Sequence, residues 1–283
     1  MKALKKPSRD ARWVFEACVN RLMSASMRER LMPLAPNIQA AEATYLEMAT
    51  TSTLYGVAGA AYYQGDRTDD MVKLYSNVLS KKSSELRYIY DEIKASAKGD
   101  ICPLCEQGVV KTLDHYLEKQ PFPIYAVAPI NLVPSCTDCN KVRSLEKPKS
   151  ASDQTLHPYF DEANDQAWLH AEILPTQPVV AEYTALRPLA WSKLKQDRVQ
   201  SHFRVLGLSA LYTTQAAVEL SQIRSALIDL VESQGTVGLQ AHLAEQANSR
   251  RAANQNSWQT ALYVALSTSE WFCGGGYHQI PEP

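Results

Sequence analysis

Apolar residues recur every three to four positions through the N-terminal part of the chain, which is the spacing of one face of an α-helix. Residues 8–32 follow this pattern and predict an amphipathic helix, which the two prolines that come next should end. A second helix is expected over residues 37–56, and the following stretch predicts one long helix or two consecutive helices closed by Gly99. Residues 1–99 are therefore expected to be an all-helical region.

The pattern changes in the second half of the chain. Residues 167–174 and 179–186 are rich in β-forming side chains and are separated by the turn sequence PTQP, which predicts a β-hairpin. From Trp191 onward helical spacing returns and continues to the glycines at 274–276. Residues 166–283 are thus expected to form a β-hairpin plus a helical C-terminal region.

Residues 100–165, between these regions, contain two C-x-x-C pairs: Cys102 with Cys105 and Cys136 with Cys139. Two such pairs can supply four thiolates to one tetrahedral zinc ion. The alternatives are disulfides, a redox site and buried inert cysteines. A chain without a leader favours a reducing compartment, a redox site needs one pair, and inert cysteines have no reason to occur as matched pairs. The sequence therefore predicts a structural Cys₄ zinc site.

Four further polar side chains lie between or beside the cysteine pairs: Asp114, His115, Asn131 and Asn140. Asp114 offers a hard oxygen ligand of the kind that suits Mg²⁺ or Mn²⁺, and His115 can take a proton from water near neutral pH. Asn140 stands at the expected start of a helix, where its amide can complete a metal site or simply cap the helix. Asn131 can hydrogen-bond the intervening loop and hold the Asp-His strand against that helix.

The order DH, N and CN inside two C-x-x-C pairs resembles that of the HNH nucleases. The resemblance implies a ββα-metal (His-Me finger) core, in which a β-hairpin and a helix hold one divalent metal. It implies that His115 is the general base, that Asp114 and Asn140 are ligands of a catalytic Mg²⁺ or Mn²⁺, and that Asn131 is mainly structural. The expected fold is then mainly α, with a small central HNH module, in an H-N-N variant, braced by the Cys₄ zinc site.

One subgroup of that family is similar over a longer run, which reads LDHYLEKQPFPIYAVAPINLVPSCTDCNKVRS and is followed by HPYFD at 157–161. These are the HNH proteins that accompany an ATPase in Septu-type and retron-associated antiphage systems. The similarity implies an ATPase partner or a retron RNA/DNA assembly, and a substrate-edge or structural role for His157. The alternative is that the HPYFD aromatics pack on the core and His157 caps a turn. Lys141 is the other candidate substrate contact.

Composition limits the remaining possibilities. The chain has 283 residues, 45% of them apolar, and a formal net charge of −1, so it can bury a core but has no global basic field. A partner protein is therefore expected to supply part of the binding to a nucleic acid. No apolar run is long enough for a transmembrane helix and no leader is evident, which predicts a cytoplasmic protein away from membranes.

The sequence thus predicts a metal-dependent endonuclease that hydrolyses phosphodiester bonds in DNA, or in RNA such as tRNA, as the effector of an antiphage complex. Two other hypotheses stay open: a non-catalytic zinc-binding module, and a structural subunit of an ATPase complex. The residues named do not separate DNA from RNA, because that discrimination depends on contacts to the 2′-hydroxyl.

Overall fold

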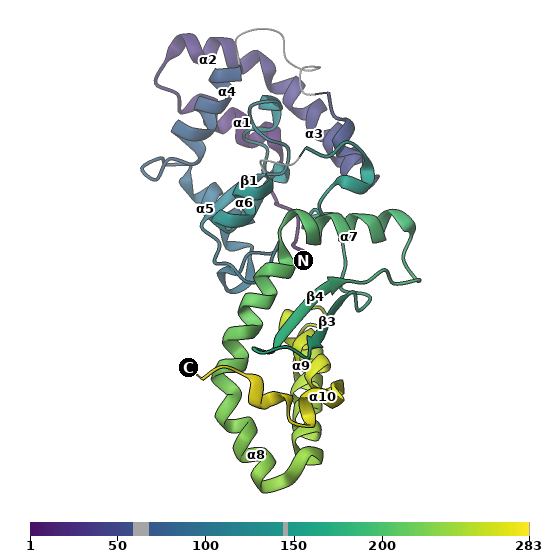
Figure 1. The fold of residues 1–283 in the computed structure, drawn as a ribbon. Helices are drawn as coiled ribbons and strands as arrows, with labels where there is room; N and C mark the ends of the chain where they lie inside the picture. Colours follow the sequence, from purple (N-terminus) through teal and green to yellow (C-terminus); the bar gives the residue numbers. More distant parts are fainter. Residues whose placement is uncertain (59–67, 144–146, 283) are drawn as a thin grey trace. The chain divides into compact units, whose positions relative to one another are not determined.

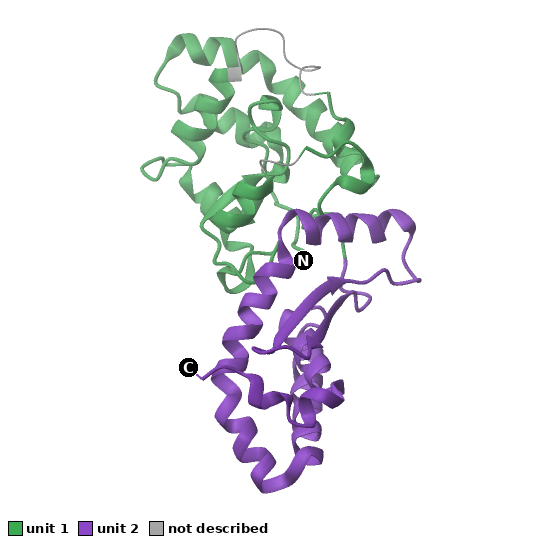
Figure 2. Cartoon of the chain, viewed as in Figure 1, with its two compact units in different colours: residues 1–162 green, residues 163–283 purple. Residues whose placement is uncertain are grey.

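The computed structural model describes residues 1–58, 68–143 and 147–282. The chain divides into two compact units, Met1–Glu162 (unit 1) and Ala163–Pro283 (unit 2), which Figure 2 shows in different colours. The expected helical N-terminal region and most of the expected central region belong together in unit 1.

Unit 1 opens with a series of short helices (Figure 1). They are α1 (Ala11–Asn20), α2 (Ala25–Leu31), α3 (Ala35–Thr50), α4 (Thr68–Leu74) and α5 (Arg87–Ala95), with a π-helical turn, Tyr75–Leu79, directly after α4. The single helix predicted over residues 8–32 is wrong. The carboxylate of Asp10 caps the N-terminus of α1 and the hydroxyl of Ser24 caps the N-terminus of α2, so this stretch forms two helices. Of the two patterns expected before Gly99, the structure has consecutive helices.

A two-stranded antiparallel sheet lies among these helices. Its strands are β1 (Thr112–His115) and β2 (Leu132–Ser135), with Asp114 opposite Val133 and His115 opposite Leu132. All four residues of β2 are buried, because α5 packs against both strands. The helix α6 (Thr137–Arg143) starts directly after β2 and packs against β1. Unit 1 therefore holds a small hairpin followed by a helix.

The loop between β1 and β2 is held against the N-terminal helices. The ring of Tyr45, in α3, contacts the ring of Tyr125 edge-on, with 5.3 Å between centroids. The Tyr125 hydroxyl also donates a 3.2 Å hydrogen bond to the carbonyl of Ala41. Five consecutive residues of the loop, 124–128, are buried. The N-terminal helices thus cover the connection that joins the two strands.

Unit 2 contains the predicted β-hairpin, which is confirmed as β3 (Leu169–Leu174) and β4 (Val180–Ala185). Its helices are α7 (Lys193–Val205), α8 (Leu208–Ala253), α9 (Trp258–Thr268) and α10 (Glu270–Cys273). Burial alternates along both strands, and α8 packs against β4 while α9 packs against β3. The helical spacing expected up to the glycines at 274–276 is interrupted at Ser269, whose hydroxyl accepts from the backbone N–H of Phe272 and caps α10.

Short 3-10 turns complete the described structure. They are Met32–Leu34, Leu54–Gly56, Lys98–Asp100, Pro123–Tyr125, Pro129–Asn131, Ala151–Asp153 and Gly276–Gln279.

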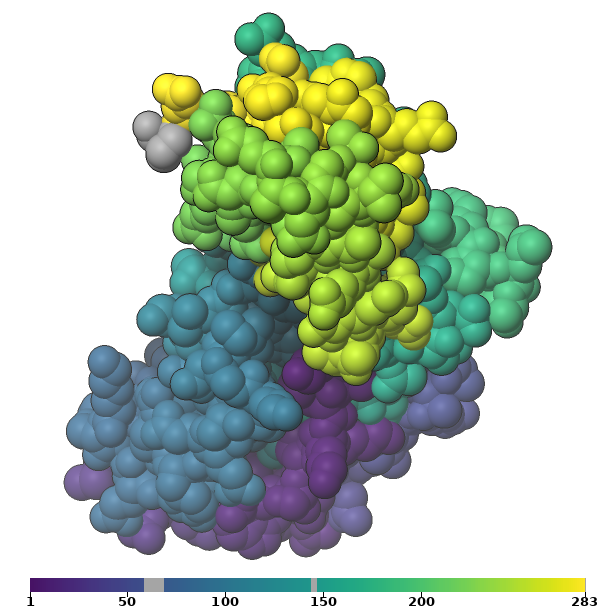
Figure 3. Space-filling model, turned by 90° about the horizontal axis from the view of Figure 1, so that it is seen from below, coloured from purple at the N-terminus to yellow at the C-terminus, as the bar shows by residue number. Residues whose placement is uncertain are grey.

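The long element α8 turns back on itself at Gly235 (Figure 1), whose φ of 68° and ψ of −175° are strained for any residue with a Cβ. Residues 232–237, around this bend, are exposed, and Figure 3 shows the yellow-green end of α8 at the surface. No helix in the described part of the chain combines the length and apolar character needed to span a membrane.

Asn256 joins the segments at the start of the unit 2 hairpin and is 4% exposed. Its Oδ1 accepts hydrogen bonds from the backbone N–H of Trp168 (2.8 Å) and of Leu169 (3.3 Å). Its Nδ2 donates to the carbonyl of Gln166 (2.9 Å) and to the Oδ1 of Asn164 (3.0 Å). One amide therefore pairs with three backbone groups and one side-chain oxygen in the segment that leads into β3.

We expect Asn256→Ala to lower the free energy of unfolding by about 2–4 kcal/mol, because two buried N–H groups and two acceptors lose their hydrogen-bond partner. The matched control is Asn248→Ala, which removes an exposed amide of α8 and should change stability by less than about 0.5 kcal/mol. Urea denaturation of the two variants measures the difference, and equal losses would contradict this role of Asn256.

Candidate functional site

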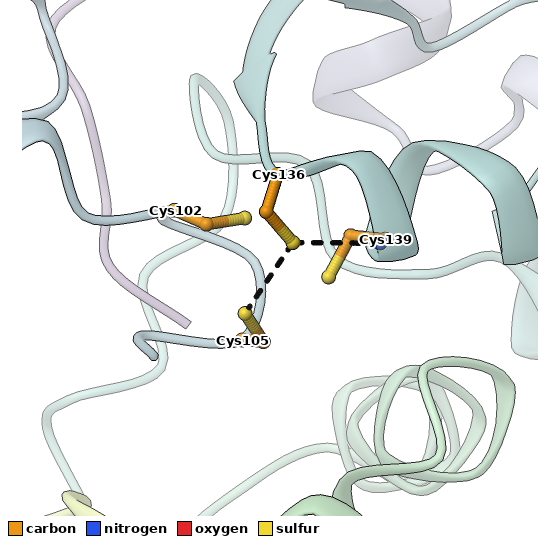
Figure 4. A group of neighbouring side chains, drawn as sticks. All are labelled: Cys102, Cys105, Cys136 and Cys139. Carbon is orange, nitrogen blue, oxygen red and sulfur yellow. Dashed lines mark hydrogen bonds between the residues drawn. The ribbon is translucent and has the colours of Figure 1, made fainter. Parts of the chain in front are cut away.

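Four cysteine side chains converge in unit 1 (Figure 4): Cys102, Cys105, Cys136 and Cys139. All four are buried, and their sulfur atoms lie within 4.8 Å of one another. A tetrahedral zinc ion with Zn–S bonds of about 2.3 Å places its sulfurs about 3.8 Å apart. The Sγ atoms of Cys105 and Cys136 are 3.9 Å apart, and all six cysteines of the chain are free thiols. The cluster can therefore hold a metal ion such as zinc, and no disulfide joins these cysteines in the structure.

The first cysteine pair sits in a tight turn. The N–H of Cys102 donates to the carbonyl of Gly108 (2.7 Å), and the N–H of Glu106 donates to the carbonyl of Cys102 (2.8 Å). The N–H of Gly108 points at the Sγ of Cys105, 3.3 Å away. N–H groups directed at a sulfur stabilise its thiolate form, which is the form that binds metal.

The second pair sits where β2 meets α6. Cys136 directly follows the strand and Cys139 lies in the first turn of the helix, with its N–H 3.5 Å from the Sγ of Cys136. The neighbouring thiols of the cluster lower the pKa of the Cys102 thiol. The four thiols thus connect the turn before β1 to the junction after β2.

His115, the last residue of β1, is held by two contacts. Its Nε2 lies 2.9 Å from the carbonyl oxygen of Ala126, and the ring of Tyr75 packs edge-on against it with 4.5 Å between centroids. A carbonyl oxygen can only accept, so Nε2 carries the hydrogen and Nδ1 keeps its lone pair. Burial lowers the pKa of His115 to about 4, against the effect of the Ala126 hydrogen bond. The imidazole is therefore neutral at pH 7.

Asn131 is fully buried and fastens the loop between the strands. Its Oδ1 accepts from the N–H of Leu117 (2.7 Å), and its Nδ2 donates to the carbonyls of Leu117 (2.9 Å) and Tyr125 (3.3 Å). Tyr125 directly precedes Ala126, whose carbonyl holds the His115 ring. Asn131 therefore acts on His115 through the loop backbone.

Asp114 is 5% exposed and forms an ion pair with Arg143, at the end of α6. Burial raises the pKa of Asp114 to about 6, and the charge and hydrogen bond of Arg143 oppose that rise. Arg143 was not among the site residues expected from the sequence. The two residues lie 29 positions apart, and only the packing of α6 on β1 brings them together.

The remaining candidates lie in different surroundings. Asn140 is half-buried in α6, and its side-chain amide has no hydrogen-bond partner among the residues the structure describes. Lys141 is exposed. His157 is 1% exposed, with its Nε2 2.9 Å from the Tyr45 hydroxyl and its Nδ1 accepting from the N–H of Tyr159 (3.2 Å). The packing alternative for His157 fits these contacts better than a substrate-edge role.

Two residues near His115 were also not expected from the sequence. Tyr75 begins the π-helical turn after α4, and such turns often occur at functional sites. The ammonium of Lys119 lies 5.2 Å from the centroid of the Tyr75 ring. Within the described ranges, Lys119 forms no ion pair with a carboxylate. Lys119 is four residues after His115 in the sequence, and this short separation was the one indication that it lies near the histidine. Tyr75 is forty residues from His115, so the sequence gave no indication of their contact.

The chain is similar to Protein ea31 of Escherichia phage lambda, with 27% identity over 301 residues that cover 97% of this chain and all of the phage protein. No protein-family model and no solved structure matches the chain. The similarity extends across both units, and the name of the phage protein describes no activity.

Gly108 tests the cysteine cluster. A Cβ at this position would lie 2.7 Å from the Cβ and 2.9 Å from the Sγ of Cys136, which is closer than real contacts allow. We expect Gly108→Ala to lose most of its bound zinc and to unfold at a lower temperature, because the Cys136 ligand must move. In the control Gly56→Ala, the nearest atom to the new Cβ is the Cε of Met48 at 3.8 Å, so zinc content should be unchanged. Elemental analysis decides, and full zinc occupancy in Gly108→Ala would contradict the site.

Acidification tests the environment of His115. Because its pKa is about 4 in the folded protein and 6.5 for an unperturbed histidine, the folded state binds fewer protons between these values. The neutral His115 therefore contributes to the free energy of unfolding above the pKa of the unfolded state, and this contribution is lost as the pH falls from about 6.5 toward 4.

Asp114 has the opposite effect on the pH dependence of stability, because its pKa is raised to about 6 in the folded protein. The native chain must therefore be compared with a variant that lacks only the His115 imidazole. We expect His115→Gln, which keeps an amide N–H for Ala126, to lose less stability than the native chain between about pH 7 and pH 5. Denaturant unfolding at both pH values measures this, and parallel losses would show that the folded structure does not lower the pKa of His115.

Proposed function

We propose that the protein is a metal-dependent endonuclease of the HNH type that hydrolyses phosphodiester bonds in DNA or RNA. The observation that carries the proposal is the setting of His115: a neutral imidazole at the end of β1, held at Nε2 by a backbone carbonyl, with Nδ1 left as the acceptor. The hairpin that carries it leads into α6 within a frame of four thiols, and the motif order DH, N, CN follows that chain path. We interpret β1, β2 and α6 as the ββα-metal module.

In this proposal His115 is the general base. Nδ1 accepts a proton from a water molecule, and the resulting hydroxide attacks phosphorus opposite the leaving oxygen. The contacts with Ala126 and Tyr75 hold the ring in one orientation, which lowers the entropic cost of reaching the reactive geometry. Asn131 holds the loop that supplies the Ala126 carbonyl.

Asp114 and Asn140 are the residues that would hold the catalytic Mg²⁺ or Mn²⁺. They offer one carboxylate and one amide oxygen, which suits a hard cation that keeps several waters, and β1 and α6, on which they lie, pack together. When bound, the metal would supply Lewis-acid stabilisation of the charge on the phosphate and on the leaving oxygen. Zinc on the four thiolates is structural in this proposal, because a Cys₄ site has no open position for substrate.

Substrate contacts would come from cations near His115. Lys119 is the strongest candidate, since its ammonium lies over the Tyr75 ring and forms no ion pair with the described carboxylates. Lys141 is a second candidate on the exposed side of α6. The formal net charge of −1 gives little general attraction for a polyanion, so we also propose that an ATPase partner contributes to binding and restrains activity.

A second candidate function is a zinc-binding module without catalytic activity. Two observations favour it: a His115 pKa of about 4 makes the imidazole a weak base, and one oxygen of Asp114 is already paired with Arg143. A bound divalent metal near the water would lower the pKa of that water and reduce the basicity His115 needs, so we favour the nuclease.

The test is cleavage of supercoiled plasmid and of total RNA by the purified chain, with Mg²⁺ or Mn²⁺, alone and with the product of the neighbouring gene. We expect His115→Ala to lose at least about 100-fold in rate while still folding and binding zinc, because general-base catalysis contributes about 10²–10⁴-fold. The control is His170→Ala, an exposed histidine of β3 that should cleave at the native rate. Equal rates in the two variants would refute the role of His115, and absence of cleavage in every arm would favour the non-catalytic module.

A further inference from the structure

We propose that Arg143 is a positioning residue that holds the Asp114 carboxylate in the orientation in which it binds the divalent metal. The inference rests on the proposed function. Arg143 lies at the end of α6, outside the motif order DH, N and CN that identifies Asp114, His115, Asn131 and Asn140.

The guanidinium of Arg143 is fixed at all three of its nitrogens. Nη1 donates to Oδ2 of Asp114, Nη2 donates to the carbonyl of Tyr116 (3.3 Å), and Nε donates to the hydroxyl of Thr155 (3.3 Å). The guanidinium carbon also lies 4.5 Å from the centroid of the Tyr116 ring. A planar fork held in this way presents one defined donor to the carboxylate.

Burial makes this pairing necessary. The side chain of Arg143 is 8% exposed and that of Asp114 is 7% exposed. A buried carboxylate is costly unless it is paired and hydrogen-bonded. Oδ2 faces Arg143, whereas Oδ1 has no hydrogen-bond partner in the part of the chain that the structure describes. The ion pair therefore leaves one carboxylate oxygen for a metal.

The same contacts argue against a blocking role, in which Arg143 would occupy the metal position and have to leave it. Its bonds to Tyr116 and Thr155 do not depend on Asp114, so binding of a cation at Oδ1 gives the guanidinium no reason to move. Carboxylates and imidazoles that bind metals are commonly oriented by hydrogen bonds of this kind, and removal of such a partner typically weakens metal binding about 10–100-fold. The two roles thus predict opposite changes in metal affinity.

The experiment is a titration of zinc-loaded protein with Mn²⁺ in the absence of nucleic acid, in which electron paramagnetic resonance of the free ion gives the dissociation constant. We expect Arg143→Gln to weaken Mn²⁺ binding roughly 10–100-fold. Arg143→Lys keeps the charge but cannot reach all three acceptors, so its loss should be smaller. It also serves as the informative variant if Arg143→Gln does not fold.

Two comparisons separate positioning from a general structural effect. The control Arg87→Gln removes another arginine of unit 1, one that pairs with Asp91 and the carbonyl of Ser80, and should leave Mn²⁺ affinity unchanged. In an Asp114→Asn background, Arg143→Gln should have no further effect on affinity, because the two residues act through one ligand.

Unchanged or tighter Mn²⁺ binding in the Arg143 variants, with zinc content retained, would overturn the inference while leaving the proposed function in place. If instead Asp114→Asn binds Mn²⁺ as tightly as the native chain, the assignment of Asp114 as a ligand fails, and the inference fails with it.

Discussion

Convergence of four thiols is the constraint on which the site in unit 1 depends. Cys102 and Cys105 lie in a turn before β1, and Cys136 and Cys139 lie at the junction of β2 and α6, so a metal shared by the four sulfurs joins both ends of the hairpin. The hairpin itself has four residues per strand, which is too short to be stable alone. The N-terminal helices cover the hairpin, and a metal held by the four thiols would add stability that the strands lack.

The candidate residues Asp114 and His115 lie on this hairpin, and Asn131 directly precedes its second strand. His115 ends β1 and is oriented by the loop that connects the strands, which Asn131 in turn fastens. Asp114 is fixed from the other side by α6, whose first turn carries Cys139. A displacement of the cysteine cluster would therefore reach the imidazole through the hairpin and the carboxylate through the helix. The site is thus a consequence of how the strands are braced.

The features that could be predicted from sequence are those encoded by local spacing. The C-x-x-C pairs indicated the thiol cluster, and alternating residues around PTQP indicated the hairpin β3–β4. The break between α1 and α2 was missed because helical spacing continues through it, and only the cap at Ser24 marks a new start. Arg143 and Tyr75 were missed for a different reason: their roles arise from packing of α6 on β1 and of the π-helical turn on His115, which no spacing along the chain encodes.

Two metals with separate tasks are central to the proposed function, and one measurement addresses them directly. Zinc-loaded protein is treated briefly with a chelator, its zinc content is determined, and phosphodiester cleavage is followed as Mg²⁺ is added back. We predict that the buried thiolates retain zinc, that cleavage of DNA or RNA is abolished by the treatment, and that Mg²⁺ alone restores it. Cleavage that persists without any added divalent ion would contradict this division of tasks between the two metals. So would a zinc-loaded chain that cuts neither polymer at any Mg²⁺ or Mn²⁺ concentration, with or without the product of the neighbouring gene.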